Sequence, residues 1–114
     1  MAADANPGPD ALVDRALDSM AAGDPASAIP FLDRALALAP DHPAAAHALL
    51  RALEDSGRLD DALALVHTLI ANDPDDPLPY TRLSILLQKK GDIPAAEAAS
   101  ARARILEWKR QLRS

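Results

Sequence analysis

The sequence predicts an all-α protein built from three consecutive helix-turn-helix units. Several residue types recur at a fixed interval of 34 positions along the 114-residue chain. Alanine and leucine fill most apolar positions, whereas Phe, Tyr and Trp occur once each. Apolar residues also follow one another at spacings of three and four, as they do on one face of a helix. Strands favour β-branched and aromatic residues, so this composition favours helices over a sheet.

The 34-residue interval appears in five separate columns of the sequence, which indicates an internal repeat. The columns contain Gly23, Gly57 and Gly91; Ala28, Ala62 and Ala96; Pro40 and Pro74; Ala35, Leu69 and Ala103; and Leu32, Val66 and Ser100. Glycine tolerates the left-handed conformation that often ends a helix, so the glycines predict turns inside helical hairpins. The alanines predict close helix crossings, and each proline predicts the end of a unit because it cannot continue a helix.

Six helices are expected from this pattern, at about 9–22, 25–38, 43–56, 59–72, 77–90 and 93–112. Asp24 and Asp76 each precede a proline, which places a capping acceptor before a proline at the first helical position. Asp92 is expected to cap the last helix in the same way. Pro30 falls in the second turn of the second helix and removes a backbone hydrogen bond, which predicts a local bend or a later helix start. Residues 1–8 are expected to be disordered.

Two short motifs mark the boundaries of the units. They are Gly-Asp-x-x-x-Ala at 23–28 and 91–96, and Ala-Pro-Asp and Asp-Pro-Asp at 39–41 and 73–75. Together with the period, they resemble the tetratricopeptide repeat, and the resemblance covers roughly residues 10–108. Departures from the family pattern include Leu50 and Ser84 where a small residue, as at Ala16, is usual. Tyr80 is the only early aromatic residue, and Trp108 stands in place of the third closing proline.

The resemblance implies a right-handed superhelical stack of three repeats, six helices in all, with the last helix extended. The domain would cover residues 9–114, with repeats at about 9–42, 43–76 and 77–114. In this family, the first helices of successive repeats line a concave groove that holds an extended or helical segment of a partner protein.

Catalytic and metal-binding patterns are missing from the sequence. The chain has no cysteine, and its four glycines are scattered singly, so it has neither a thiol nucleophile nor a phosphate-binding loop. His42, His47 and His67 are not spaced to share one helical face as zinc ligands. The carboxylates of 73–76 fit turn and capping chemistry better than a calcium loop. We therefore expect no enzyme activity, no metal and no cofactor.

The net charge of −5 is unevenly distributed. Residues 1–100 carry a charge of −9 and residues 101–114 a charge of +4. The acidic body argues against nucleic-acid binding, which needs a broad basic surface. The basic end could attract an acidic partner or RNA, or simply complement the dipole of its own helix. The first ten residues do not read as a signal peptide, and no apolar run is long enough to span a bilayer, so a cytoplasmic protein without membrane contact is expected.

The resemblance assigns a set of partner-binding residues to the groove face of the first helices. They are Asp10, Val13, Leu17, Met20, His47, Arg51, Glu54, Asp55, Leu78, Thr81, Ile85, Gln88 and Lys89. The alternative for Val13, Leu17 and Ile85 is that they pack between repeats.

One subset of the family grips the C-terminal carboxylate of heat-shock chaperones through converging lysine, arginine and asparagine side chains. At the matching positions this chain has Val13, Leu17 and Ala48, and only Arg82 could serve as a donor. A carboxylate clamp needs several donors, so this co-chaperone role is not expected.

The last helix is a second candidate interface. Ile105, Trp108 and Leu112 fall at i, i+3 and i+7 and form an apolar stripe flanked by basic residues such as Lys109. The stripe could fold back on the third repeat as a cap, or it could contact a second copy or another protein, since tryptophan is a common interface anchor.

These observations favour a protein–protein interaction module, a scaffold, adaptor or assembly factor that binds a protein segment in the groove or through the last helix. The alternative is a small structural subunit that stabilises a larger complex or a homo-oligomer through Trp108 and the basic tail.

Overall fold

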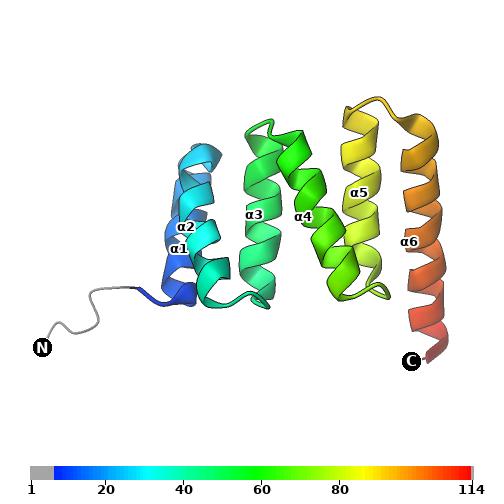
Figure 1. Cartoon of the computed structure of the whole chain (residues 1–114), viewed down its shortest axis with the longest axis horizontal. Coiled ribbons are helices and arrows are strands. Elements are labelled where there is room, and N and C mark those ends of the chain that lie inside the picture. The colour runs from blue at the N-terminus through cyan, green and yellow to red at the C-terminus, as the bar shows by residue number, and fades with distance from the viewer. Residues whose placement is uncertain (1–6, 114) are drawn as a thin grey trace, which may run out of the picture. The chain divides into compact units, whose positions relative to one another are not determined.

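The computed structural model describes residues 7–113, and within them the chain forms six helices and no strand. The helices are α1 (Pro9–Ala21), α2 (Pro25–Leu38), α3 (Pro43–Asp55), α4 (Leu59–Asn72), α5 (Pro77–Lys89) and α6 (Ile93–Arg113) (Figure 1). The predicted all-α class is confirmed, and every helix end lies within one residue of its predicted position. Of the expected disordered segment, residues 1–6 lie outside the described residues, and Pro7 and Gly8 lead directly into α1.

The chain divides into two compact units, one ending at Arg58 and the other beginning at Leu59. Unit 1 contains α1, α2 and α3, with α2 packed against both of the others and α1 also touching α3. Unit 2 contains α4, α5 and α6, with α5 packed against both of its neighbours. The division falls in the turn between α3 and α4, inside the second repeat.

Small side chains allow the helices to approach closely. Ala28, Ala62 and Ala96, which form one column of the repeat, are all fully buried. Ser84 is the buried polar residue of α5, and its hydroxyl donates a 2.8 Å hydrogen bond to the carbonyl of Ala96 on α6. This bond satisfies the hydroxyl inside the core, which explains how a serine is accommodated where α5 contacts α6.

The turn within each helical hairpin has the same backbone geometry. Gly23, Gly57 and Gly91 have φ values of 82°, 75° and 86°. Each glycine N–H donates to the carbonyl three residues earlier, and the next residue donates to the carbonyl five residues earlier. These two bonds satisfy carbonyls at the end of the preceding helix. The prediction of left-handed glycines at the hairpin turns is confirmed.

Aspartates cap three of the helices, as predicted. The side chain of Asp24 accepts from the backbone N–H of Ser27, that of Asp76 from Leu78, and that of Asp92 from Ala95, at 3.2, 3.0 and 3.2 Å. Since α2 begins at Pro25, the predicted alternative of a later start is wrong. Pro30 lies inside α2 on its exposed side. Because proline has no N–H to donate to the Ala26 carbonyl four residues earlier, that carbonyl can be hydrated instead.

Candidate protein-binding surfaces

The predicted groove residues of unit 1 differ in their exposure. Leu17 is 43% exposed, whereas Val13 is only 5% exposed and packs inside the unit. On α3, His47 and Arg51 are exposed. The remaining predicted residues of this unit are exposed, as Asp10 and Asp55 are, or half-buried, as Met20 and Glu54 are. The exposed predicted residues through which unit 1 could contact a partner are therefore Leu17, His47 and Arg51, together with Asp10 and Asp55.

The predicted groove residues of unit 2 lie along α5. Leu78 is 42% exposed, Thr81, Gln88 and Lys89 are also exposed, and Ile85 is half-buried. Thus most of this face of α5 remains accessible within the unit.

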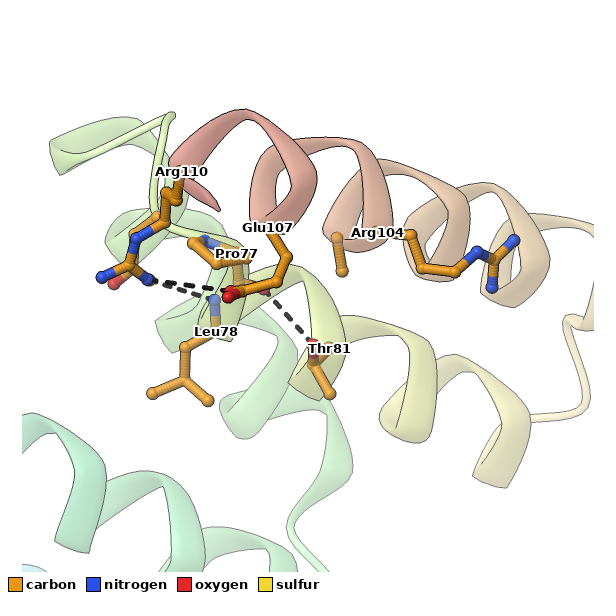
Figure 2. A pocket seen from close by; sticks show the side chains of 8 residues that line it. Pro77, Leu78, Thr81, Arg104, Glu107 and Arg110 are labelled. Atoms are coloured by element: carbon orange, nitrogen blue, oxygen red, sulfur yellow. Dashed lines mark hydrogen bonds and ion pairs between the residues drawn. The ribbon is translucent and has the colours of Figure 1, made fainter. Parts of the chain in front are cut away.

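A pocket of about 620 Å³ lies between the start of α5 and the C-terminal half of α6 (Figure 2). We call it the α5–α6 pocket. It is lined by Asp76, Pro77, Leu78, Thr81, Ala103, Arg104, Glu107 and Arg110. Leu78 and Thr81 are predicted groove residues, whereas the three charged residues of α6 were not assigned to the groove by the sequence. The structure thus extends the candidate site onto the last helix.

Short-range contacts connect residues that line the α5–α6 pocket. The Thr81 hydroxyl donates a 3.4 Å hydrogen bond to the Pro77 carbonyl. On α6, Arg110 Nη1 and Glu107 Oε2 form an ion pair at 4.0 Å across one turn. Glu107 and Arg110 extend over the start of α5, while Arg104 points away along α6 (Figure 2). The pocket therefore combines apolar surface from Leu78 and Pro77 with a charged rim, an arrangement typical of protein-binding surfaces.

The same corner of unit 1 is closed. Two repeats, or 68 residues, before Leu78 and Arg110 stand Asp10 and His42. A 2.6 Å hydrogen bond from His42 Nε2 to Asp10 Oδ1 joins their side chains. His42 also caps α3, because its Nδ1 accepts from the N–H of Ala45 at 3.2 Å. In unit 1 the start of α3 therefore occupies the place that corresponds to the α5–α6 pocket of unit 2. This role of His42 was not predicted from the sequence.

The apolar stripe of the last helix faces away from unit 2. Ile105, Trp108 and Leu112 are 44%, 59% and 66% exposed. With 3.6 residues per turn, they lie on the side of α6 opposite its buried residues, such as Ala103 and Leu106. The stripe therefore does not fold back on the third repeat as a cap. Lys109 is exposed beside it.

Part of the basic end of the chain lies beside the acidic turn before α5. Arg110 and Arg113 line a hollow of about 290 Å³ together with Asp73, Asp75 and Asp76. Asp73 Oδ1 accepts from the N–H of Asp75 at 3.2 Å, so these aspartates do serve turn and capping roles. The hollow places opposite charges of unit 2 close together, which reduces the basic surface that this end presents to a partner.

Neither a metal site nor a membrane span is found in the described part of the chain. Across residues 7–113, no three histidine or carboxylate side chains are grouped as metal ligands would be. None of the six helices combines the length and apolarity needed to cross a bilayer.

Repeated helical hairpins with left-handed glycine turns and exposed faces define this chain as a helical-repeat protein. A sequence model described as "Tetratricopeptide repeat" matches residues 19–81, more than half of the chain. The chain belongs to the tetratricopeptide repeat family.

Solved structures share the fold. The chain is similar to YrrB, described as a TPR protein with an unusual peptide-binding site, with a TM-score of 0.81 and 20% identity over 90% of this chain. It spans only 53% of YrrB. It is also similar to the Yersinia enterocolitica type III secretion translocator chaperone SycD, with a TM-score of 0.77 and 18% identity, covering 86% of this chain and 74% of that one. No curated protein sequence matches the chain significantly.

Proposed function

We propose that this protein is an interaction module, a scaffold, adaptor or assembly factor, that binds a segment of a partner protein through the first helices of its repeats. The observation that carries the proposal is the α5–α6 pocket, where the predicted groove residues Leu78 and Thr81 meet Glu107 and Arg110. The peptide-binding site named for YrrB supports the same kind of ligand.

The pocket suits a peptide side chain. Its volume of about 620 Å³ exceeds that of any single side chain, and the rim offers both carboxylate and guanidinium groups to a peptide backbone. In unit 1 the exposed side chains of Leu17, His47 and Arg51 offer the corresponding mixture of apolar and polar contacts. We expect the ligand segment to contact α5 through an apolar anchor and α6 through polar groups.

Site-specific photocrosslinking tests this proposal. A benzophenone amino acid at Thr81 should crosslink to a discrete protein partner in cells, and mass spectrometry of the adduct should identify one partner peptide. The same group at Ala64, an exposed position on α4, is the matched control and should give no such adduct. The partner peptide, made synthetically, should bind the purified chain, and Thr81→Arg should abolish its binding. Equal crosslinking from both positions, or unchanged affinity in Thr81→Arg, would count against the pocket.

The second candidate function is that of a small structural subunit that joins a larger complex or a homo-oligomer through Trp108. The exposure of Ile105, Trp108 and Leu112 favours it, since large apolar side chains grouped on one surface often mark an interface. A structural subunit should dimerise or aggregate until its partner is added, whereas an adaptor should remain a soluble monomer. Light scattering of the wild type and of Trp108→Asp separates the two, because only a structural subunit should change its size with the substitution.

A further inference from the structure

We infer that the outer face of α6 is a docking site for an acidic amphipathic helix of a partner protein. This inference rests on the proposed role as a protein-binding module, but it concerns a surface that shares only Arg104 with the α5–α6 pocket. Five apolar residues on α6 are separated by three, four, three and four positions, which is the heptad spacing of a helix-pairing surface. We call them the α6 seam, and they are Ala98, Ala101, Ile105, Trp108 and Leu112.

The seam is accessible along its length. Ala98, Ile105, Trp108 and Leu112 are exposed, and Ala101 is half-buried. The residues that α6 buries against α5, such as Ala99 and Leu106, occupy the opposite side of the helix, so the heptad pattern is not a consequence of packing within unit 2. A helix that already packs against its neighbour through one apolar face does not need another for its own fold. A second apolar face with regular heptad spacing therefore indicates contact with a further helix.

The residues beside the seam determine which helix fits. In a heptad pairing, the flanking positions form the interhelical ion pairs that select the partner. Arg102 and Lys109 flank the seam on one side, and Glu97, Arg104 and Gln111 flank it on the other. Three of these five residues are basic and one is acidic, so a partner helix with acidic residues at its flanking positions would form the most favourable pairs.

Charge argues against a second copy of this chain as the occupant. Residues 101–114 contain five basic and one acidic side chain, a net charge of +4, and self-pairing would bring two such segments together. In an antiparallel pair, Arg102 would face Lys109 of the other copy. In a parallel pair, the attraction of Glu97 for Arg102 would be offset by the repulsion between Arg104 and Lys109.

An apolar hollow between α5 and α6 adjoins the seam at Ala98, its N-terminal residue. The hollow has a volume of about 430 Å³ and is lined by His67, Tyr80, Leu83, Leu87, Ala95, Ala98, Ala99 and Arg102. The hollow arises because the third repeat has the small Ala99 at the position where the first and second repeats have the larger Phe31 and Leu65. A docked helix could therefore place one large apolar side chain in the hollow while its remaining apolar residues contact the seam.

Designed peptides provide the probe for this inference. The test peptide is about three heptads long, with leucine at the two seam-facing positions and glutamate at the flanking positions. One control peptide has lysine at the flanking positions, and a second has the acidic composition in scrambled order. None contains tryptophan, because Trp108 is the only tryptophan of the chain and its emission reports contact with the seam directly. Binding is measured by Trp108 fluorescence and by anisotropy of labelled peptides.

The acidic heptad peptide should bind about tenfold more tightly than either control peptide, with a blue shift of Trp108 emission and weaker binding at high salt. The double variant Arg102→Glu/Lys109→Glu should reverse the preference toward the lysine peptide. Arg34→Glu, at the exposed position equivalent to Arg102 in the first repeat, is the matched control and should bind like the wild type. Leu112→Asp should abolish binding without changing the helical circular dichroism.

Three outcomes would overturn the inference. Equal binding of the scrambled acidic peptide would mean that charge alone is recognised, and equal binding of the lysine peptide would mean that charge is not selected. Self-association of the chain that Trp108→Asp removes would mean that a second copy occupies the seam. The two proposals also fail separately, because Thr81→Arg should leave binding of the acidic heptad peptide unchanged. Loss of this binding in Thr81→Arg would contradict the assignment of two separate surfaces.

Discussion

The side chains of His42 and Asp10, 32 residues apart in sequence, are joined by a 2.6 Å hydrogen bond that closes one corner of unit 1. Nδ1 of His42 accepts from the N–H of Ala45 while Nε2 contacts Asp10, so the imidazole links the start of α1 to the start of α3. Leu78 and Arg110 hold the equivalent positions in unit 2, where they line an open pocket instead. One pair of repeat positions thus serves stability in one unit and forms a candidate binding site in the other.

His42→Ala should lower the free energy of unfolding by about 1–2 kcal/mol, because it removes both the cap of α3 and the bond to Asp10. Urea denaturation followed by circular dichroism measures the change. His47→Ala, at an exposed position inside α3, is the matched control and should change the stability by less than about 0.5 kcal/mol. Similar losses in the two variants would show that the His42 contacts contribute nothing specific.

Ala99→Leu and Ala96→Leu should have opposite effects although both lie on α6. Leucine at position 99 should partly fill the apolar hollow and raise the stability by about 0.5–2 kcal/mol, since Leu65 holds this column in the second repeat. Leucine at position 96 should cost about 1–3 kcal/mol, because Ala96 is fully buried at the crossing with α5. Thermal unfolding of both variants checks the prediction, and destabilisation by Ala99→Leu would mean that the hollow cannot admit the larger side chain.

Gly57→Ala should destabilise the chain by about 1–2 kcal/mol, because the residue has a φ of 75° and an L-residue is strained there. No atom lies within 4 Å of an added Cβ, so the expected cost is conformational rather than steric. Gly8→Ala is the control, since Gly8 has a φ of −76° and an equally open environment. Chemical denaturation should therefore separate the two variants, and equal midpoints would contradict a conformational cost at Gly57.

Acid should weaken the start of α2 through Asp24. The Ser27 hydroxyl, and then the Ser27 backbone N–H, donate to the Asp24 carboxylate and lower its pKa below the ordinary value. Because the folded pKa is the lower one, this contribution to stability is present above the unfolded pKa and is lost as pH falls through the folded pKa. NMR titration of the Asp24 carboxyl should show the lowered midpoint, and Ser27→Ala should raise it. An unchanged midpoint in Ser27→Ala would rule out the hydroxyl as the main cause.

The helices could be predicted from the sequence because their signals are local. Gly23, Asp24 and Pro40 each act on the backbone within a few residues, and the 34-residue interval repeats such signals along the chain. The α5–α6 pocket was only half predicted, because it depends on tertiary packing that brings Glu107 and Arg110 beside the start of α5. The role of His42 was missed for the same reason, since a contact across 32 residues follows from packing rather than from local pattern. For Val13 the sequence left packing between repeats as the alternative, and its burial agrees with that alternative.

The shared geometry of the turns at Gly23, Gly57 and Gly91 has an evolutionary consequence. Each hairpin is closed by the same two backbone bonds and the same left-handed glycine, so no turn depends on its order in the chain. A duplication of 34 codons therefore adds one complete turn of this geometry, and a deletion of 34 codons removes one without altering the others. Related genes can differ in length by whole repeats while each hairpin is inherited intact.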